Sequence, residues 1–181
     1  GTNRTTITTP YALTSPVVVT RGSSQGTILP NISVSGATIV VSGNHTSTEF
    51  YVGERYSMTY EFSEPTLKEP TATGGRVAIT GGRLQIKHWL LRYQDSGDFT
   101  VKIQQKGSST SKDYVFTGFV VGDGTSTLGA NALTSGDFKF PVMSKADRIR
   151  VIIESNSHLP CQFLSAEWEG NMHLRSRRVN G

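Results

Sequence analysis

The stretch DFTVKIQQ, Asp98 to Gln105, decides the fold class of this chain. In it the apolar residues Phe99, Val101 and Ile103 alternate one by one with polar residues. Successive side chains of a β-strand point to opposite faces, so a period of two places these apolar side chains on one face. The stretch therefore predicts a β-strand with one buried face and one face in solvent.

The same alternation recurs in YSMTYEF at residues 56–62 and in RIRVIIES at residues 148–155. Residues that favour tight turns separate such runs, for example Gly81-Gly82 and Ser135-Gly136-Asp137. No segment of helical length shows apolar residues at spacings of three and four. We therefore expect an all-β fold, an antiparallel β-sandwich of jelly-roll type with little or no helix.

One strand changes its phase. In RLQIKHWLLRY, residues 83–93, Leu84 and Ile86 share one face, whereas Trp89 and the alternate apolar residues after it fall on the other. Either this strand is buried on both sides, or a β-bulge near His88 reverses the alternation. We favour the bulge.

The domain organisation follows from length and composition. The chain has 181 residues, within the usual size of a single domain. Residues 1–30 are dense in Thr, Ser and Pro, and we expect an extended arm or edge strand there. Residues 31–181 are expected to form a single all-β domain. The chain begins with Gly1 and not with methionine, which favours a piece of a longer protein.

Charge and cysteine content exclude few functions. The chain carries 18 Lys and Arg against 14 Asp and Glu, a net charge of +4 that does not by itself imply a nucleic-acid-binding protein. Cys161 is the only cysteine, so no intramolecular disulfide can form, and we expect it to be buried beside Phe163. No apolar stretch approaches the length of a membrane span.

The sequence offers no catalytic, cofactor or metal motif. Gly122–Gly129, GDGTSTLG, has the glycine density of a phosphate-binding loop, but it lacks lysine and no helix pattern follows, so we expect a hairpin loop. No G-x-S-x-G motif of a nucleophilic serine occurs. The histidines lack the spacing of metal ligands; they are His45, His88, His158 and His173.

A pair of carboxylates near the end of the chain resembles a catalytic pair. In a strand, Glu167 and Glu169 would share a face with Cα atoms roughly 6.5 Å apart, a separation that invites comparison with glycosidases. Such pairs usually come from different strands, however, and need an acid in an apolar cleft. We favour an inward Trp168, sharing its face with Leu164 and Ala166, and both glutamates in solvent.

Long segments resemble a known family. GGRLQIKHWLLRYQDSGDFTVKI at residues 81–103 and FKFPVMSKADRIRVIIESNSHLPCQFLSAEWEGN at residues 138–171 resemble the C-terminal part of the tail tubular protein B family. These are the nozzle proteins of short-tailed double-stranded-DNA phages. The shared features are the turn Ser96–Phe99, Phe140-Pro141-Val142 and the closing Trp168–Asn171. The resemblance extends over roughly residues 50 to 178. Residues 1 to 49 resemble the family only in their β character.

The resemblance implies an architectural function without a catalytic centre. It implies a ring of six copies in the virion tail, in contact with adaptor and fibre proteins, around the passage through which double-stranded DNA leaves. Synthesis in the bacterial host cytoplasm is implied as well. The expected core residues are Trp168, Phe163, Phe99 and Tyr60.

The basic end of the chain has two interpretations. Arg175, Arg177 and Arg178 could contact phosphates and add salt-dependent affinity for DNA, or they could pair with acidic groups of a neighbouring subunit. A channel through which a genome slides should not hold phosphates strongly. We therefore favour subunit pairing.

A second function class stays open, a carbohydrate-binding or carbohydrate-cleaving module of the phage tail. It would need exposed aromatic rings in a groove beside polar groups. The candidates have alternating positions that predict mostly burial, and two or more coplanar rings on an open surface would favour this function. They are Tyr51, Tyr56, Trp89 and Tyr93.

Overall fold

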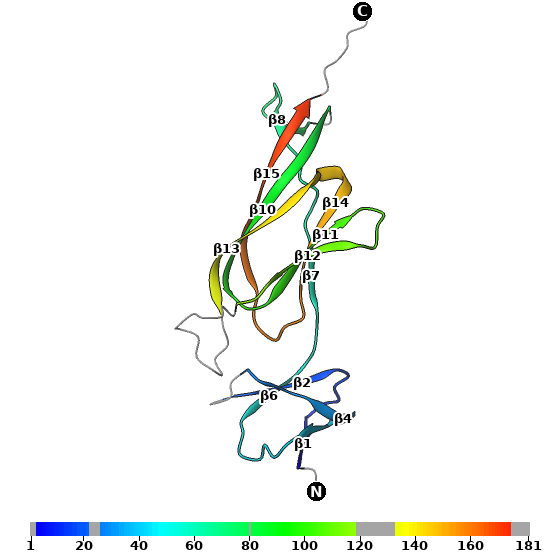
Figure 1. Ribbon diagram of the computed structural model, residues 1–181, viewed down its shortest axis with the longest axis vertical. Helices are drawn as coiled ribbons and strands as arrows, with labels where there is room; N and C mark the ends of the chain where they lie inside the picture. Colours follow the sequence, from blue (N-terminus) through cyan, green and yellow to red (C-terminus); the bar gives the residue numbers. More distant parts are fainter. Residues whose placement is uncertain (1–2, 22–25, 80, 119–132, 175–181) are drawn as a thin grey trace, which may run out of the picture.

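The computed structural model describes residues 3–21, 26–79, 81–118 and 133–174. Within these ranges it consists of antiparallel β-strands and one short 3-10 turn, Ala146–Arg148, which confirms the all-β prediction. No helix in these ranges is long and apolar enough to cross a membrane. Figure 1 shows two bodies, a smaller one near the N-terminus and a larger one that contains the rest of the described chain.

The smaller body, here called the first unit, contains two three-stranded sheets with the orders β1-β5-β4 and β3-β2-β6. Its strands alternate, as in β2, where Pro16, Val18 and Thr20 are buried. The strands are β1 (Arg4–Thr8), β2 (Pro16–Thr20), β3 (Ile28–Leu29), β4 (Asn31–Ser35), β5 (Thr38–Ser42) and β6 (Phe50–Glu54). The core of this unit consists of Ile7, Val18, Leu29, Ile39 and Val41.

The strand pairing crosses the division expected at residue 30. β1 is an edge strand against β5, whereas β2 is the central strand of its sheet. Both strands contribute buried side chains, Ile7 and Val18, to the core that they share with Ile39. We therefore place a division at the connection 55–57, where the first unit ends and the second begins.

The second unit is a sandwich of two sheets, with the orders β12-β11-β14-β7 and β13-β10-β15. Their inner faces form a separate core that includes Ile86, Trp89, Phe99, Val101 and Phe140. The strands are β7 (Met58–Glu61), β10 (Gly82–Ser96), β11 (Phe99–Gln105), β12 (Ser111–Phe116), β13 (Thr134–Lys145), β14 (Ile149–Ser155) and β15 (Gln162–Leu174).

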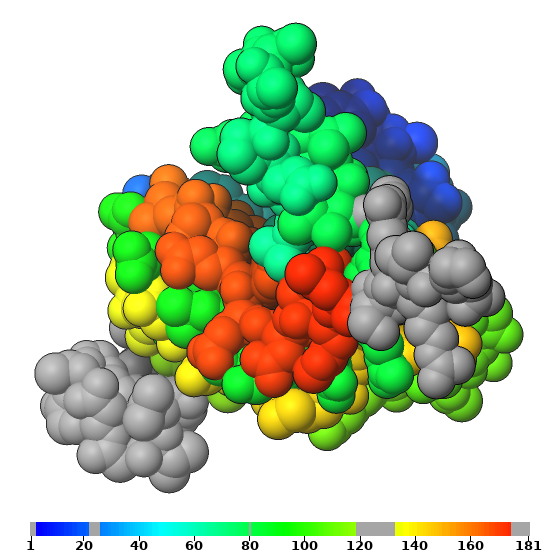
Figure 2. Space-filling model, turned by 90° about the horizontal axis from the view of Figure 1, so that it is seen from above, coloured from blue at the N-terminus to red at the C-terminus, as the bar shows by residue number. Residues whose placement is uncertain are grey.

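A two-stranded hairpin leaves the sandwich between β7 and β10. It consists of β8 (Lys68–Pro70) and β9 (Arg76–Ala78), and every residue of both strands is exposed. Figure 2 shows this segment standing out from the body of the molecule.

The predicted bulge near His88 is confirmed. The pairing of β10 with β13 and its pairing with β15 both shift between Ile86 and His88. Because one extra residue enters the strand there, Ile86 and Trp89 come to the same inner face, where they are 0% and 3% exposed. The phase change in the sequence is the mark of this bulge.

The turn Ser96–Phe99 joins β10 to β11 through a buried hydroxyl. Ser96 is 0% exposed, its Oγ donates to the carbonyl of Gln94, and it accepts from the backbone N–H of Gln162 at 2.9 Å. Gly97 follows because a Cβ there would lie 2.4 Å from the side chain of Leu159. The turn therefore ties the end of β10 to the start of β15.

The expected core residues fall into different environments. Phe99 is 2% exposed, while Phe163 and Trp168 are half-buried and pack against the core. The expectation for Tyr60 is wrong, because its side chain is 56% exposed. Tyr60 pairs with the buried Ile153 and so shares its face, but β7 is an edge strand, and none of the described strands lies on its outer side.

The expected face of Leu164 is also wrong, since this residue is 52% exposed. The pairing of β15 with β10 shifts between Arg92 and Tyr93, so that Phe163 and Ala166 turn inward with Trp168 and Leu164 turns outward. The cause is a second bulge, which the alternation of residues did not predict.

Candidate functional site

The carboxylate pair of β15 lies on the outer face of the sheet. Glu167 and Glu169 are exposed, and Glu169 Oε2 lies 3.0 Å from His88 Nε2, with Lys87 Nζ at 3.8 Å from its other oxygen. Neither glutamate stands in an apolar cleft, which a glycosidase acid would need. Both glutamates are surface carboxylates, and Glu169 is paired with His88 and Lys87.

The remaining polar candidates do not converge on one site. Among the described residues no group of three or more His, Cys, Asp and Glu could hold a metal ion. His45 contacts the carbonyl of Ser42, and Cys161 is half-buried with its thiol donating to the carbonyl of Asp98. Gly122–Gly129 and the arginines Arg175, Arg177 and Arg178 lie outside the described residues.

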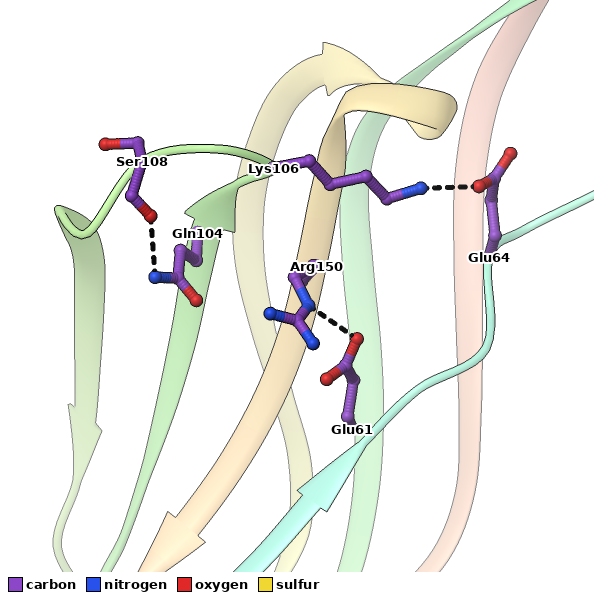
Figure 3. Close-up of polar contacts among 6 residues, drawn as sticks. All are labelled: Glu61, Glu64, Gln104, Lys106, Ser108 and Arg150. Atoms are coloured by element: carbon purple, nitrogen blue, oxygen red, sulfur yellow. Dashed lines mark hydrogen bonds and ion pairs between the residues drawn. The ribbon is translucent and has the colours of Figure 1, made fainter.

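The outer face of the sheet that contains β11 is covered by internal ion pairs. Lys102 Nζ lies 2.6 Å from Glu154, and this hydrogen bond, together with the negative charge, raises the pKa of Lys102. Figure 3 shows Arg150 bonded to Glu61 at 2.8 Å. Because these charges satisfy one another, this face is a poor candidate for a binding surface that needs free charges.

Two further contacts lie at the turn between β11 and β12. In Figure 3, Lys106 reaches Glu64 at 2.7 Å, and Gln104 donates to the carbonyl of Ser108. The pair Lys106–Glu64 joins the turn after β11 to the chain just beyond β7.

The four aromatic candidates for carbohydrate binding divide into two pairs. Trp89 and Tyr93 are 3% and 8% exposed, so they belong to the core. Tyr51 and Tyr56 are 61% and 76% exposed, and both line one groove. Tyr51 lies on β6, and Tyr56 lies on the connection between the units. The alternation of apolar and polar residues did not predict that these two side chains would line the same groove.

The groove lies where the two units meet and has a volume of about 410 Å³. Its floor is apolar, because Val17 and Val19 of β2 turn their side chains away from the core of the first unit. Gly53, which pairs with Val17, has no side chain to cover it. Arg21 lies over the ring of Tyr51 at 5.6 Å, and His158 closes the side of the second unit.

The surface of the first unit is nearly free of charge. Residues 3–54 contain the four charged residues Arg4, Arg21, Glu49 and Glu54 and no other Asp, Glu, Lys or Arg. Arg21 pairs with Glu49 at 3.7 Å, and the carboxylate of Glu54 accepts from the backbone N–H groups of the segment before β2. The sequence after residue 54 is much richer in charged residues, and this contrast, although it can be read from the sequence, was not predicted.

Several large apolar side chains are exposed on this charge-poor unit. Protein interfaces are depleted of charged residues at their centre and enriched in aromatic residues. The first unit has this composition, so we take its surface as the candidate assembly surface. Its exposed apolar residues are Tyr11, Ile28, Ile32, Val34 and Tyr51.

The described residues define a class of protein, an all-β protein with two different surfaces. Its second unit carries ion pairs, and its first unit has few charged residues and several exposed apolar side chains. Over residues 1–179 the chain matches the family of bacteriophage nozzle proteins. The chain belongs to this family, which gives it a structural role in the phage tail.

A curated relative supports the same assignment. The chain is 30% identical over 139 residues to the tail tubular protein gp12 of Escherichia phage T7. The matched region is 77% of this chain and 17% of that protein. The chain therefore corresponds to a small share of the length of the relative that it matches.

Proposed function

We propose that this chain is part of a tail nozzle subunit that assembles with copies of itself around the passage through which the genome leaves the virion. The match over residues 1–179 to the nozzle family is the observation that carries this proposal. The charge-poor first unit supports self-assembly, since its exposed apolar side chains would be covered by a neighbouring subunit. The wider proposal includes a ring of six copies, contacts with tail adaptor and fibre proteins, and synthesis in the host cytoplasm.

The test uses the full gene product and the virion. Native mass spectrometry and electron microscopy of the purified protein should show a closed ring, and antibodies against the chain should label the tail. Phage that lack the gene should yield particles without this part of the tail. A protein that stays monomeric and is absent from purified virions would contradict the proposal.

The arginine-rich end is assigned to subunit pairing within this proposal. Changing Arg175, Arg177 and Arg178 together to glutamine in the full gene product should weaken ring assembly. The affinity for duplex DNA, measured at two salt concentrations, should change little. Intact rings together with a large, salt-sensitive loss of DNA affinity would instead place these arginines near the DNA.

Carbohydrate binding is the second candidate, and one observation favours it. Tyr51 and Tyr56 are exposed in the same groove, beside polar groups such as Asn156 and His158. Calorimetry with host surface oligosaccharide should then show binding that Tyr51→Ala and Tyr56→Ala each abolish. Hydrolysis of the oligosaccharide that disappears in Glu167→Gln or Glu169→Gln would support a cleaving module. Absence of binding by the parent protein would dismiss both.

A further inference from the structure

The sheet β1-β5-β4 ends in two open edges. Within the described ranges, β4 and β1 each pair with β5 and with no strand on their other side. Both are antiparallel to β5, so they run parallel to each other, and each has five residues. One unit therefore presents two open edges of matching length and direction.

The edge formed by β4 lacks the charged residues that protect many such edges. The unpaired N–H and C=O groups of an edge strand can capture another strand, and native proteins prevent this with charged residues, proline or bulges. All five residues of β4 are exposed, and the sequence from Gly22 to Thr48 contains no Asp, Glu, Lys or Arg. A bulge does lie between Asn31 and Ser33, and the register is regular from Ser33 to Ser35.

Apolar side chains are left uncovered at this edge. Val34 pairs with Ile39, which is 0% exposed, so Val34 lies on the core-facing side of the sheet. It is nevertheless 39% exposed, and Ile32 is 45% exposed. A further strand beside β4 would cover Val34 and continue the core of the first unit.

We propose that β4 of one copy pairs with β1 of the next copy, so that the sheet continues across the boundary between subunits. Copies in a head-to-tail arrangement would bring these two edges together as a parallel pair. Such a contact joins two different surfaces and closes into a ring when the rotation between copies permits. The nearly uncharged composition of both edges avoids like-charge repulsion between them. The inference rests on the proposed self-assembly and adds the surface by which it occurs.

Two variants of β4 test the edge itself. Val34 stands next to the pair Ser35–Thr38, which closes a two-residue hairpin, so its N–H points away from β5. Val34→Pro removes this donor without removing a bond inside the sheet, and Ile32→Lys adds a charge to the edge. The matched control is Val115→Lys, since Val115 is 71% exposed on the edge strand β12 of the second unit.

In the full gene product, we expect Val34→Pro and Ile32→Lys to raise the concentration at which the rings dissociate at least tenfold, as measured by analytical ultracentrifugation. Val115→Lys should leave it unchanged. Circular dichroism of the dissociated subunits should show an unaltered fold. Rings as stable as those of the parent in both edge variants would overturn the inference.

Crosslinking identifies the partner of the edge. Thr6 and Ser33 both pair with Val40, so they lie at the same level of the sheet on its two edge strands. With the remaining cysteines changed to serine, the double variant Thr6→Cys, Ser33→Cys and a short bismaleimide should give a ladder of covalent oligomers. Each single variant should give none.

Other outcomes separate the alternatives. Dimers from Ser33→Cys alone would show pairing of β4 with β4, and they would overturn the head-to-tail contact. Rings without crosslinks in the double variant would show that another part of the polypeptide covers the edge, which overturns this inference and leaves the proposed function intact. A parent protein that forms no rings would overturn both.

Discussion

Gly170 shows how a single atom decides the packing of two strands. A Cβ at this position would lie 2.4 Å from the backbone carbonyl oxygen of Gln85, because β15 approaches β10 closely at the bulge before His88. The glycine in the motif Trp168–Asn171 is therefore required by the neighbouring strand and not by its own conformation.

We expect Gly170→Ala to lower the free energy of unfolding by about 1 to 3 kcal/mol, because the carbonyl of β10 must move to accept the methyl group. Gly53→Ala is the matched control, since no atom lies within 4 Å of its added Cβ. Urea unfolding of both variants measures the difference. Equal stability of the two variants would contradict the close approach.

The pair Arg92–Asp137 gives a prediction on pH. Arg92 Nε donates to Asp137 Oδ1 at 2.9 Å, and this hydrogen bond lowers the pKa of the Asp137 carboxyl. A lowered pKa in the folded state stabilises the fold above the ordinary pKa of aspartate, about 3.9. This stabilisation is lost as the pH falls through the lowered value.

Asp137→Asn should therefore reduce the melting temperature at pH 7 by a small amount, because both side chains are exposed to solvent. The difference from the parent should shrink at about pH 2, because the stabilisation is lost progressively as the pH falls below the ordinary pKa of aspartate. Differential scanning calorimetry at the two pH values measures it, with Asp147→Asn as the control, because Asp147 is an exposed residue of the 3-10 turn. A difference that grows on acidification would contradict the assignment.

At the scale of the element, alternation located the strands but not their edges. The bulge of β10 could be predicted because two apolar phases meet within one run, at Ile86 and Trp89. The exposure of Tyr60 could not be predicted, because the alternation around it is that of a strand with a buried face. Only the pairing of the strands shows that β7 is an edge strand. The groove between Tyr51 and His158 was also beyond prediction, because it depends on how two units meet.

The closing strand β15 gives a graded prediction. Trp168 faces Trp89 across the pairing with β10, yet it is only half-buried, so Trp168→Ala should cost about 2 to 3 kcal/mol. Phe99→Ala, which empties a fully buried position, should cost about 3 to 5 kcal/mol. Chemical denaturation gives both values. If Trp168→Ala lowered the free energy of unfolding more than Phe99→Ala, residues other than the described ones would have to cover β15.

At the scale of the whole molecule, the two cores are separate. The core around Ile39 and the core around Val101 share no residue, and no strand of one unit pairs with a strand of the other in the described chain. The units should therefore unfold independently.

Ile39→Ala, at a cost of about 2 to 5 kcal/mol, should accelerate hydrogen exchange in β1 to β6 and leave β10 to β15 protected. Val101→Ala should do the reverse. Mass spectrometry of exchanged peptides distinguishes the two units. A uniform loss of protection in either variant would show that the molecule unfolds as one cooperative body.

The short edge strand β7 has a mechanical consequence. The connection from the first unit enters the sandwich at β7 (Figure 1), which begins at Met58. β7 is held by its register with β14 and by the ion pair Glu61–Arg150 (Figure 3). Tension between the two units acts along this strand and loads its few backbone hydrogen bonds together in shear. β7 would therefore yield before the longer ladders of β10. The chain beyond it would still be held by the ring of Phe62, which packs on Trp89, and by the pair Lys106–Glu64. A subunit built in this way absorbs a sudden pull at one strand and keeps the rest of its structure intact.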